Sequence, residues 1–359
     1  MTLPPGTGPG DRGDTSVRER PADSGGSGRT VQAAGVVCWR PVPGATDPAG
    51  GIEVLLVHGT RHQEWSWPKG KRQSDETGPE CAVRETAEET GVGVVLGRPL
   101  PAARYALPDG RPKHVAYWAA QPAAAGESAL GGNPVAHDPA PPAEVDGTQW
   151  VSLARARELL PHAENHAPLD AVARMATEGT LDTRPLLLLR HASSFPRTRW
   201  TPPDAQRPLS EEGHRQAAAL PRLLACWRPT RLVTSPWRRC VDTIAGYLTA
   251  TGQTARAEPR LSEEGLLRDP KAPGEEVDGM LSAGEPALLC THRPVLGEAL
   301  QAIRDHAAPE VVVHLPDRDP FLEPGEVLVA HALPRRHLVV AVERHRLGSG
   351  DPFTGVLPG

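Results

Sequence analysis

The N-terminal half of the chain alternates short apolar segments with polar loops. Residues 30–40 and 52–59 are rich in Val, Leu and Ala and flank a Pro/Gly/Asp loop, so each is predicted to be a strand. Residues 79–90 favour a helix, because Pro79 suits its first position and Gly91 the position just past its end. Further elements are predicted as strands near 114–120 and 148–153, helices over 152–160 and 166–177, and a long mobile Ala/Pro/Gly loop over 121–147.

The C-terminal half opens on `RPLLLLRH`, residues 184–191, whose continuous apolar run fits a strand buried on both faces of a parallel sheet. A helix is predicted after Ser210, with Glu211 and Glu212 in its first turn. The remaining pattern predicts strands over 231–235, 286–292, 326–333 and 337–344, and helices near 237–250 and 295–305. Strand–helix alternation of this kind indicates an α/β layered domain.

A length of 359 residues predicts two domains, at about 150 residues each. The Pro/Gly/Asp/Arg-rich N-terminus is typical of a disordered tail, and the end of the chain is interpreted as disordered or docking. The predicted organisation is a tail over 1–30, a first domain over 31–178, a linker over 179–184, a second domain over 185–345 and a C-terminal tail over 346–359.

The charge and cysteine content narrow the class of protein. With 39 basic and 44 acidic residues the net charge is −5, which argues against a protein that coats nucleic acid or a membrane surface. There is no long apolar run and no secretory signal pattern, and the five cysteines form no CxxC pair. We therefore expect a cytoplasmic protein with reduced thiols and a small-molecule partner, binding neither nucleic acid nor membrane.

Three glutamates crowd one face of the helix predicted over 79–90. Glu85, Glu88 and Glu89 stand at i, i+3 and i+4, so their carboxylates share a face and repel one another. Such a cluster occurs on solvated helices, but it also offers the oxygen ligands that Mg²⁺ and Mn²⁺ prefer. The three glutamates alone do not decide between these alternatives.

The spacing of the residues around these glutamates decides between a solvated helix and a metal site. Residues 70–92 match the pattern GX5EX7REUXEEXGU, and residues 31–178 resemble the Nudix hydrolases, which cleave nucleoside diphosphates linked to another moiety. The resemblance implies an α/β/α sandwich and a hydrolase that needs Mg²⁺ or Mn²⁺. It implies metal ligation by the Gly70 carbonyl, Glu85, Glu88 and Glu89, with Glu76 and Arg84 in support. Glu85 is one candidate for the catalytic base, and the choice among the glutamates stays open. Thr86 departs from the usual Ile, Leu or Val.

The segment before the pattern, `WSWPKGK`, resembles Nudix branches that act on diadenosine polyphosphates and on oxidised purine triphosphates. Lys69 and Lys71 flank Gly70 and are candidates to meet phosphates as point charges. Trp65 and Trp67 either stack on a base or form a structural pair under the loop.

A second set of motifs begins with Arg190 and His191 at the C-terminal end of a predicted strand, where α/β sheets place their ligand sites. With `RPLSEEGHRQA`, `TSPWRRCVDTI`, `EPRLSEEG` and `CTHRP`, residues 185–344 resemble the histidine phosphatase superfamily, which implies a three-layer α/β domain. The resemblance makes His191 the nucleophile in a phosphate pocket that needs no metal. It assigns the pocket to Arg190, Arg239 and His292, and the proton donor to Glu263, with Glu264 as the alternative.

Three departures from that second pattern leave catalysis open. Ala192 replaces the commoner glycine, Asp242 stands where glutamine is usual, and Arg293 places a bulky cation where it is expected to crowd the pocket. The second domain is therefore either a phosphatase or a non-catalytic docking module.

The two resemblances in this order are similar to the two-domain MutT-like nucleotide sanitisers. They imply metal-dependent hydrolysis of a phosphoanhydride bond in a nucleoside polyphosphate, above all 8-oxo-guanine (deoxy)nucleoside triphosphates. The alternative substrates are diadenosine polyphosphates or other polyphosphate signals.

Overall fold

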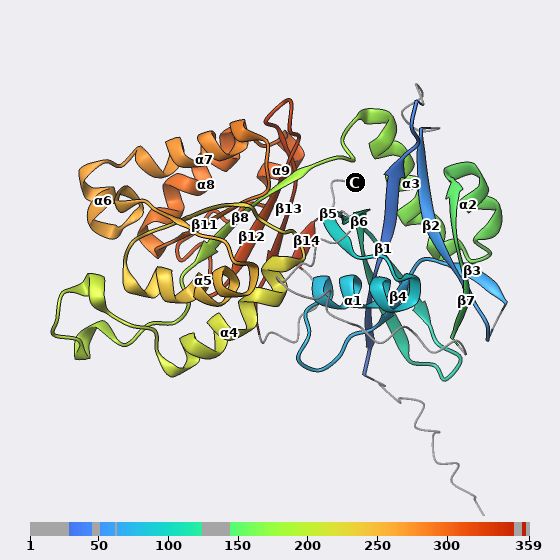
Figure 1. Cartoon of the computed structure of the whole chain (residues 1–359), viewed down its shortest axis with the longest axis horizontal. Helices are drawn as coiled ribbons and strands as arrows, with labels where there is room; N and C mark the ends of the chain where they lie inside the picture. Colours follow the sequence, from blue (N-terminus) through green and yellow to red (C-terminus); the bar gives the residue numbers. More distant parts are fainter. Residues whose placement is uncertain (1–28, 45–50, 62, 124–143, 348–353, 357–359) are drawn as a thin grey trace, which may run out of the picture.

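The computed structural model describes residues 29–44, 51–61, 63–123, 144–347 and 354–356. Each half of the chain forms a sheet covered by helices (Figure 1), so the α/β prediction is confirmed. Most of the long loop predicted over 121–147 lies outside the described residues, as does the tail predicted over 1–30 apart from its last two residues.

The first sheet runs in the order β3-β2-β1-β6-β5, with β4 paired to β1 and β7 paired to β2. Its elements are β1 Val31–Pro41, β2 Ile52–Gly59, β3 Glu64–Ser66, β4 Lys69–Lys71, α1 Gly78–Thr90, β5 Val94–Ala106, β6 Pro112–Pro122, β7 Val145–Ser152, α2 Leu153–Leu159 and α3 His166–Glu178. Alternate residues of β1 face opposite layers, because Val36 packs with Cys81 and Ala82 of α1, whereas Val37 packs with Val172 of α3. The sheet therefore lies between α1 on one side and α2 and α3 on the other, as the sandwich prediction required.

The second sheet runs in the order β10-β9-β11-β8-β12-β13-β14. Its strands are β8 Arg184–Arg190, β9 Arg231–Thr234, β10 Arg256–Ala257, β11 Ala287–Thr291, β12 Val327–Ala332, β13 Val339–His345 and β14 Thr354–Val356, and its helices are α4 Glu211–Ala225, α5 Arg238–Thr251, α6 Glu263–Arg268, α7 Ala272–Ala283, α8 Leu296–Asp305 and α9 Pro309–Val312. The strands β8 to β11 are parallel and β12 to β14 antiparallel. Leu187 packs with α4 and α5, and Leu188 packs with α7 and α8, which gives the three predicted layers.

Some elements escape the sequence pattern. β5 is an edge strand that contains Gly97, Pro99 and Pro101, and its pairing with β6 shifts register around these residues. Proline is tolerated in an edge strand, but because it is rare in other strands, the sequence pattern did not predict a strand here. Helix α7 was not predicted either, because Pro273 and Gly274 in its first turn are residues that usually disfavour a helix. Residues 354–356 of the C-terminal tail pair with β13, so this part of the tail extends the sheet.

The two domains share a buried interface. The Leu96 N–H donates to the Cys226 carbonyl at 2.9 Å, and Arg98 Nη2 donates to the Val340 carbonyl at 3.0 Å. Trp118 Nε1 of the first domain donates to Glu343 Oε2 of the second at 2.8 Å. Because hydrogen bonds in a buried interface are costly to break, the domains are expected to hold one relative placement.

Glu343 links the domains through a buried carboxylate. Besides Trp118, it contacts Nε2 of His331 at 2.8 Å and Nε2 of His345 at 2.9 Å. Burial alone would raise the pKa of Glu343, but the two histidines lower it to about 2. The carboxylate thus contributes stability that is present above the pKa of an unfolded glutamate and is lost as the pH falls from about 4.5 towards 2.

We expect Glu343→Gln to lower the free energy of unfolding at pH 7 by about 3 kcal/mol, because it removes the charge of a buried pair. Urea denaturation measures the loss. The variant should also lose less stability than the wild type between pH 4.5 and 2. An unfolding free energy within about 0.5 kcal/mol of the wild type would contradict this role.

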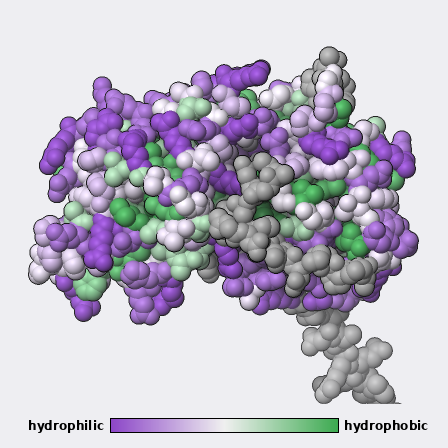
Figure 2. Space-filling view, in the orientation of Figure 1, coloured by the Kyte–Doolittle hydropathy of each residue, from purple (hydrophilic) through white to green (hydrophobic). Residues whose placement is uncertain are grey.

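One face of the molecule shows how polar and apolar residues are distributed on the surface. On the face drawn in Figure 2, polar residues predominate and apolar residues occur in small scattered areas. Among the described residues, the helices are too short or too polar to span a bilayer.

Candidate active sites in the two domains

Local capping fixes where α1 begins and ends. Thr77 accepts a hydrogen bond from the Glu80 N–H, and the Glu80 carboxylate accepts one from the Thr77 N–H at 2.7 Å. This reciprocal pair satisfies two backbone donors that the first helical turn leaves open. Gly91 ends the helix with φ of 70°, a conformation that suits glycine. The helix begins one residue earlier than predicted, at Gly78.

Arg84 organises the acidic face of α1. Its Nε donates to Glu76 Oε1 at 2.7 Å, and its Nη1 contacts both Glu85 Oε1 and Glu88 Oε2 at 2.8 Å. The guanidinium therefore lies between two of the carboxylates predicted to bind metal and ties both to Glu76. A single cation offsets the repulsion that the i, i+3, i+4 spacing creates.

Glu89 and Gly70 bring the preceding loop against this face. The Lys69 N–H donates to Glu89 Oε2 at 2.9 Å, and burial raises the pKa of Glu89 to about 7. Burial also raises the pKa of Glu85. A side chain at position 70 would collide with the Glu85 carboxylate, so glycine lets the loop backbone approach this carboxylate without displacing it.

This donor set fits a hard divalent cation in its chemistry, since three carboxylates share one helix face beside a loop backbone. In the part of the chain that the structure describes, however, no three His, Cys, Asp or Glu side chains already form a metal-binding cluster. Arg84 provides the positive charge between Glu85 and Glu88 that a cation would otherwise supply. Metal binding at this face thus remains a prediction.

The structure separates the two tryptophans that were predicted to stack on a base. Trp67 is fully buried, and its Nε1 donates to the Asn165 carbonyl at 2.9 Å, so the stacking alternative is wrong for this residue. Trp65 on β3 is partly exposed, and its ring centroid lies 5.0 Å from that of His58. Lys71 is exposed, whereas Lys69 is partly buried, with Nζ 3.3 Å from Ser66 Oγ.

Lys113, near the lysines that flank Gly70, was missed, as was Tyr105 beside it. Lys113 on β6 lies with Nζ 5.7 Å from the ring centroid of Tyr105 on β5. Burial, with Lys69 and Lys71 nearby, lowers the pKa of Lys113 to about 8. Both residues line a hollow of about 510 Å³ together with His114. Lys113 belongs to no sequence motif, so its position near Lys69 and Lys71 could be found only from the structure.

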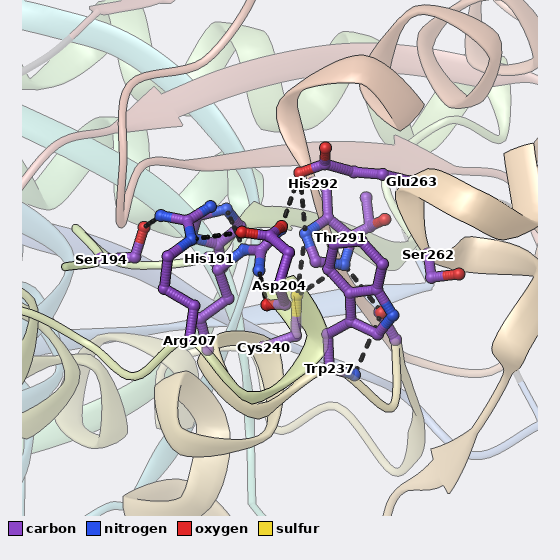
Figure 3. A network of polar contacts seen from close by, with 12 residues as sticks. His191, Ser194, Asp204, Arg207, Trp237, Cys240, Ser262, Glu263, Thr291 and His292 are labelled. Atoms are coloured by element: carbon purple, nitrogen blue, oxygen red, sulfur yellow. Dashed lines mark hydrogen bonds and ion pairs between the residues drawn. The ribbon is translucent and has the colours of Figure 1, made fainter. Parts of the chain in front are cut away.

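In the second domain, His191 follows β8 directly and is largely buried (Figure 3). Its Nδ1 lies 2.8 Å from the Ala192 carbonyl and must therefore carry the proton, while Nε2 accepts from Arg239 Nε at 3.2 Å. Burial, with Arg239 and Arg190 nearby, lowers the pKa of His191 to about 3. The ring is thus neutral, with the lone pair of Nε2 available as a nucleophile.

His292 follows β11, the parallel neighbour of β8, so the two histidines meet at the same edge of the sheet. Their ring centroids are 5.3 Å apart, and His292 Nε2 contacts Ser235 Oγ at 2.7 Å. Arg239, on α5, has no exposed surface and stacks 4.6 Å above the ring of Trp237. The structure therefore brings together three of the predicted pocket residues.

Two carboxylates surround Arg239. Glu263 Oε1 accepts from Arg239 Nη2 at 2.6 Å and lies 3.9 Å from His292 Nδ1, whereas Glu264 is exposed and pairs with Arg268. The geometry favours Glu263 over Glu264 as the acid in the pocket. The second carboxylate, Asp204, was missed, because nothing in its local sequence distinguishes it.

Asp204 joins the pocket through arginines, accepting from Arg207 Nε at 2.6 Å and from Arg197 Nη2 at 2.8 Å. Partial burial would raise the pKa of Asp204, but these hydrogen bonds lower it to about 2.

The arginines at positions 190 and 293 each have a partner outside the pocket motifs. Arg190 donates from Nη1 to the Leu322 carbonyl at 2.7 Å. Arg293 is half exposed and its guanidinium pairs with Asp319, and the expectation that it crowds the pocket stays a prediction. A surface acid beyond the motif holds this cation, which the sequence spacing could not indicate.

Comparison with known proteins assigns each half of the chain to a protein family. Residues 40–173 match the NUDIX domain, and residues 186–346 match the histidine phosphatase superfamily (branch 1). The 8-oxo-(d)GTP phosphatase of Mycolicibacterium smegmatis is 34% identical over 275 residues, which cover 75% of this chain and 80% of that protein. The chain is a Nudix hydrolase with a fused histidine phosphatase domain.

Solved structures are similar to parts of this Nudix hydrolase. A binary complex of the C. elegans Ap4A hydrolase is 26% identical and covers 42% of this chain and 99% of its own, with a TM-score of 0.33. A mycobacterial glucosyl-3-phosphoglycerate phosphatase is 17% identical and covers 44% and 95%, with a TM-score of 0.31. At these scores neither match carries a conclusion about substrate.

Proposed function

We propose that this Nudix hydrolase cleaves a phosphoanhydride bond in a nucleoside polyphosphate, with 8-oxo-(d)GTP as its foremost substrate. The observation that carries the proposal is the relative named 8-oxo-(d)GTP phosphatase, whose similarity spans 75% of the chain. The partly buried acidic face of α1 supports it, because carboxylates facing a glycine loop suit the chemistry of a metal-bound polyphosphate.

In this proposal Glu85, Glu88, Glu89 and the Gly70 carbonyl hold Mg²⁺ or Mn²⁺. When bound, the ion supplies neutralising charge and lowers the pKa of a coordinated water. Arg84 keeps the glutamates in place, and the three lysines at positions 69, 71 and 113 approach the phosphates. The partial burial of Lys69 and Lys113 strengthens their attraction to an anion.

A nucleotide panel tests the substrate class. The full-length protein is incubated with Mg²⁺ and 8-oxo-dGTP, 8-oxo-GTP, dGTP, diadenosine tetraphosphate or a nucleotide sugar, and the products are separated by chromatography. The proposal predicts the highest kcat/KM for an oxidised guanine nucleotide. A higher value for the nucleotide sugar would overturn the branch assignment, and one for diadenosine tetraphosphate would favour the alternative substrate.

Trp65 is proposed to stack on the base, since it is the accessible member of the tryptophan pair. We expect Trp65→Ala to weaken nucleotide binding by about 1–3 kcal/mol with kcat little changed, because stacking acts in the ground state as well. Trp200→Ala in the phosphatase domain is the matched control. An unchanged dissociation constant for the nucleotide in the Trp65 variant would rule out stacking.

A second activity is proposed for the phosphatase domain, because His191, Arg239, His292 and Glu263 converge there. In this scheme His191 Nε2 attacks the phosphorus of a phosphomonoester and a P–N bond forms. The P–O bond to the leaving group breaks as Glu263 donates a proton to the departing oxygen. Water then attacks the phosphohistidine and releases inorganic phosphate.

A further inference from the structure

The Nudix helix α1 is packed against the phosphatase domain as well as against its own sheet. Helix α4 of the phosphatase domain contacts α1, and Cys81 and Ala82 of α1 belong to the same buried cluster as Leu220 and Leu224 of α4. Just past the end of α4, the Cys226 carbonyl accepts a hydrogen bond from β5 of the Nudix domain. Figure 1 shows the two helices on either side of the domain boundary. The placement of α1 therefore depends on α4.

One side chain of α4 reaches the loop that leads into α1. Arg222 Nη2 donates to the Asp75 carbonyl at 2.9 Å, and Arg222 Nε lies 3.2 Å from Glu80 Oε1. Glu80 is the residue whose other carboxylate oxygen caps the helix at Thr77. Arg222 thus holds both the loop backbone and the first turn of α1.

Asp75, whose carbonyl Arg222 contacts, is the residue directly before Glu76. Glu76 pairs with Arg84, and Arg84 pairs in turn with Glu85 and Glu88. These three partners of Arg84 are largely buried, with side-chain exposures of 9%, 14% and 25%, so the links between them are shielded from water. A shift of the loop backbone at Asp75 is therefore transmitted to the glutamates by charge-assisted hydrogen bonds.

We propose that Arg222, a residue of the phosphatase domain, is a positioning residue for the Nudix site. By fixing the Asp75 carbonyl and Glu80, it holds the loop and the first turn of α1 in the arrangement that presents Glu85, Glu88 and Glu89 to a divalent cation. This inference rests on the proposed metal role of those glutamates. It gives the phosphatase domain a part in Nudix catalysis that does not depend on His191.

The contribution of Arg222 to overall stability is small, because its side chain is 53% exposed and exposed ion pairs are screened by water. Its effect is instead on geometry, where a small displacement of ligands reduces both metal affinity and turnover. The test separates these two consequences.

The experiment uses the full-length protein and its variants Arg222→Ala and Arg222→Lys. The matched control is Arg215→Ala on the same helix, since Arg215 pairs only with Glu211 and Glu212 of α4 among its described contacts. Mn²⁺ binding is measured by electron paramagnetic resonance without nucleotide. The kcat and KM for 8-oxo-dGTP are measured in Mg²⁺, and thermal unfolding checks the fold.

We expect Arg222→Ala to weaken Mn²⁺ binding and lower kcat by about 3- to 30-fold each, with KM within about twofold of the wild type. Arg222→Lys should restore part of the loss, and Arg215→Ala should behave as the wild type. If Arg222→Ala unfolds, Glu80→Gln serves in its place, because it keeps a cap for Thr77 and removes only the ion pair with Arg222.

Wild-type Mn²⁺ binding and kcat in a folded Arg222→Ala protein, or an equal loss in Arg215→Ala, would overturn the inference. Glu89→Gln is measured alongside to identify the cause of failure. If Glu89→Gln loses activity while Arg222→Ala does not, only the positioning role fails. If Glu89→Gln also binds Mn²⁺ and turns over normally, the proposed function itself fails.

Discussion

Replacing His191 with alanine is expected to abolish metal-independent phosphate release by the C-terminal domain, with a loss of at least about 10³-fold. The reason is that Nε2 of His191 is the nucleophile in the proposed scheme, and alanine offers no atom to form the phosphoenzyme. Phosphate release from phosphomonoesters and nucleotides is measured in EDTA, together with acid-labile phosphate on the protein. Metal-dependent Nudix cleavage should persist, because its glutamates belong to the other domain.

His214→Ala is the matched control, since His214 is an exposed histidine on α4. The pH profile provides a second check on the nucleophile. Because the pKa of His191 is lowered to about 3, Nε2 stays unprotonated, and kcat/KM should not fall between pH 8 and 5 through this group. If the wild type releases no phosphate and forms no phosphoenzyme, the domain is a docking module and the scheme is wrong.

Glu89→Gln is expected to lower Nudix turnover by roughly 10²-fold or more with little change in fold. The amide oxygen of glutamine can still accept the hydrogen bond from the Lys69 N–H, so the loop keeps its anchor. What is lost is a charged oxygen ligand on the face that Glu85 and Glu88 share. Turnover of 8-oxo-dGTP in Mg²⁺ and the thermal unfolding temperature are the measurements.

The control for this variant is Glu212→Gln, because Glu212 is exposed on α4 and pairs with Arg215 alone among its described contacts. It should retain full activity and stability. Unchanged turnover in Glu89→Gln, or full wild-type activity in excess EDTA, would show that the acidic face does not hold an essential metal.

The sequence predicts most of what depends on local spacing. Pro79 and Gly91 at the ends of α1 and the apolar run of β8 are local signals that indicate these elements, whereas the site residues were predicted from the resemblance of the two motif sets to known families. Glu263 was preferred over Glu264 from its position in the motif, and only the packing of the short helix shows that Glu263 contacts Arg239 while Glu264 pairs with Arg268.

What the sequence could not indicate depends on contacts between distant segments. Trp67 is buried because its indole reaches Asn165, almost 100 residues away, and the prolines of β5 are tolerated because that strand lies at a sheet edge. Asp204 and Lys113 join their sites through neighbours from other elements. The contact between Arg222 and the Nudix loop likewise exists only after the domains pack.

The central claim is that this Nudix hydrolase acts, with a divalent metal, on an oxidised guanine nucleotide. Its most direct test is the ratio of kcat/KM for 8-oxo-dGTP over dGTP, measured for the wild type with Mg²⁺ and again in excess EDTA. We predict a preference for 8-oxo-dGTP of at least about 10-fold with Mg²⁺ and loss of the cleavage in EDTA. Equal values for the two nucleotides, or cleavage that continues in EDTA, would contradict it.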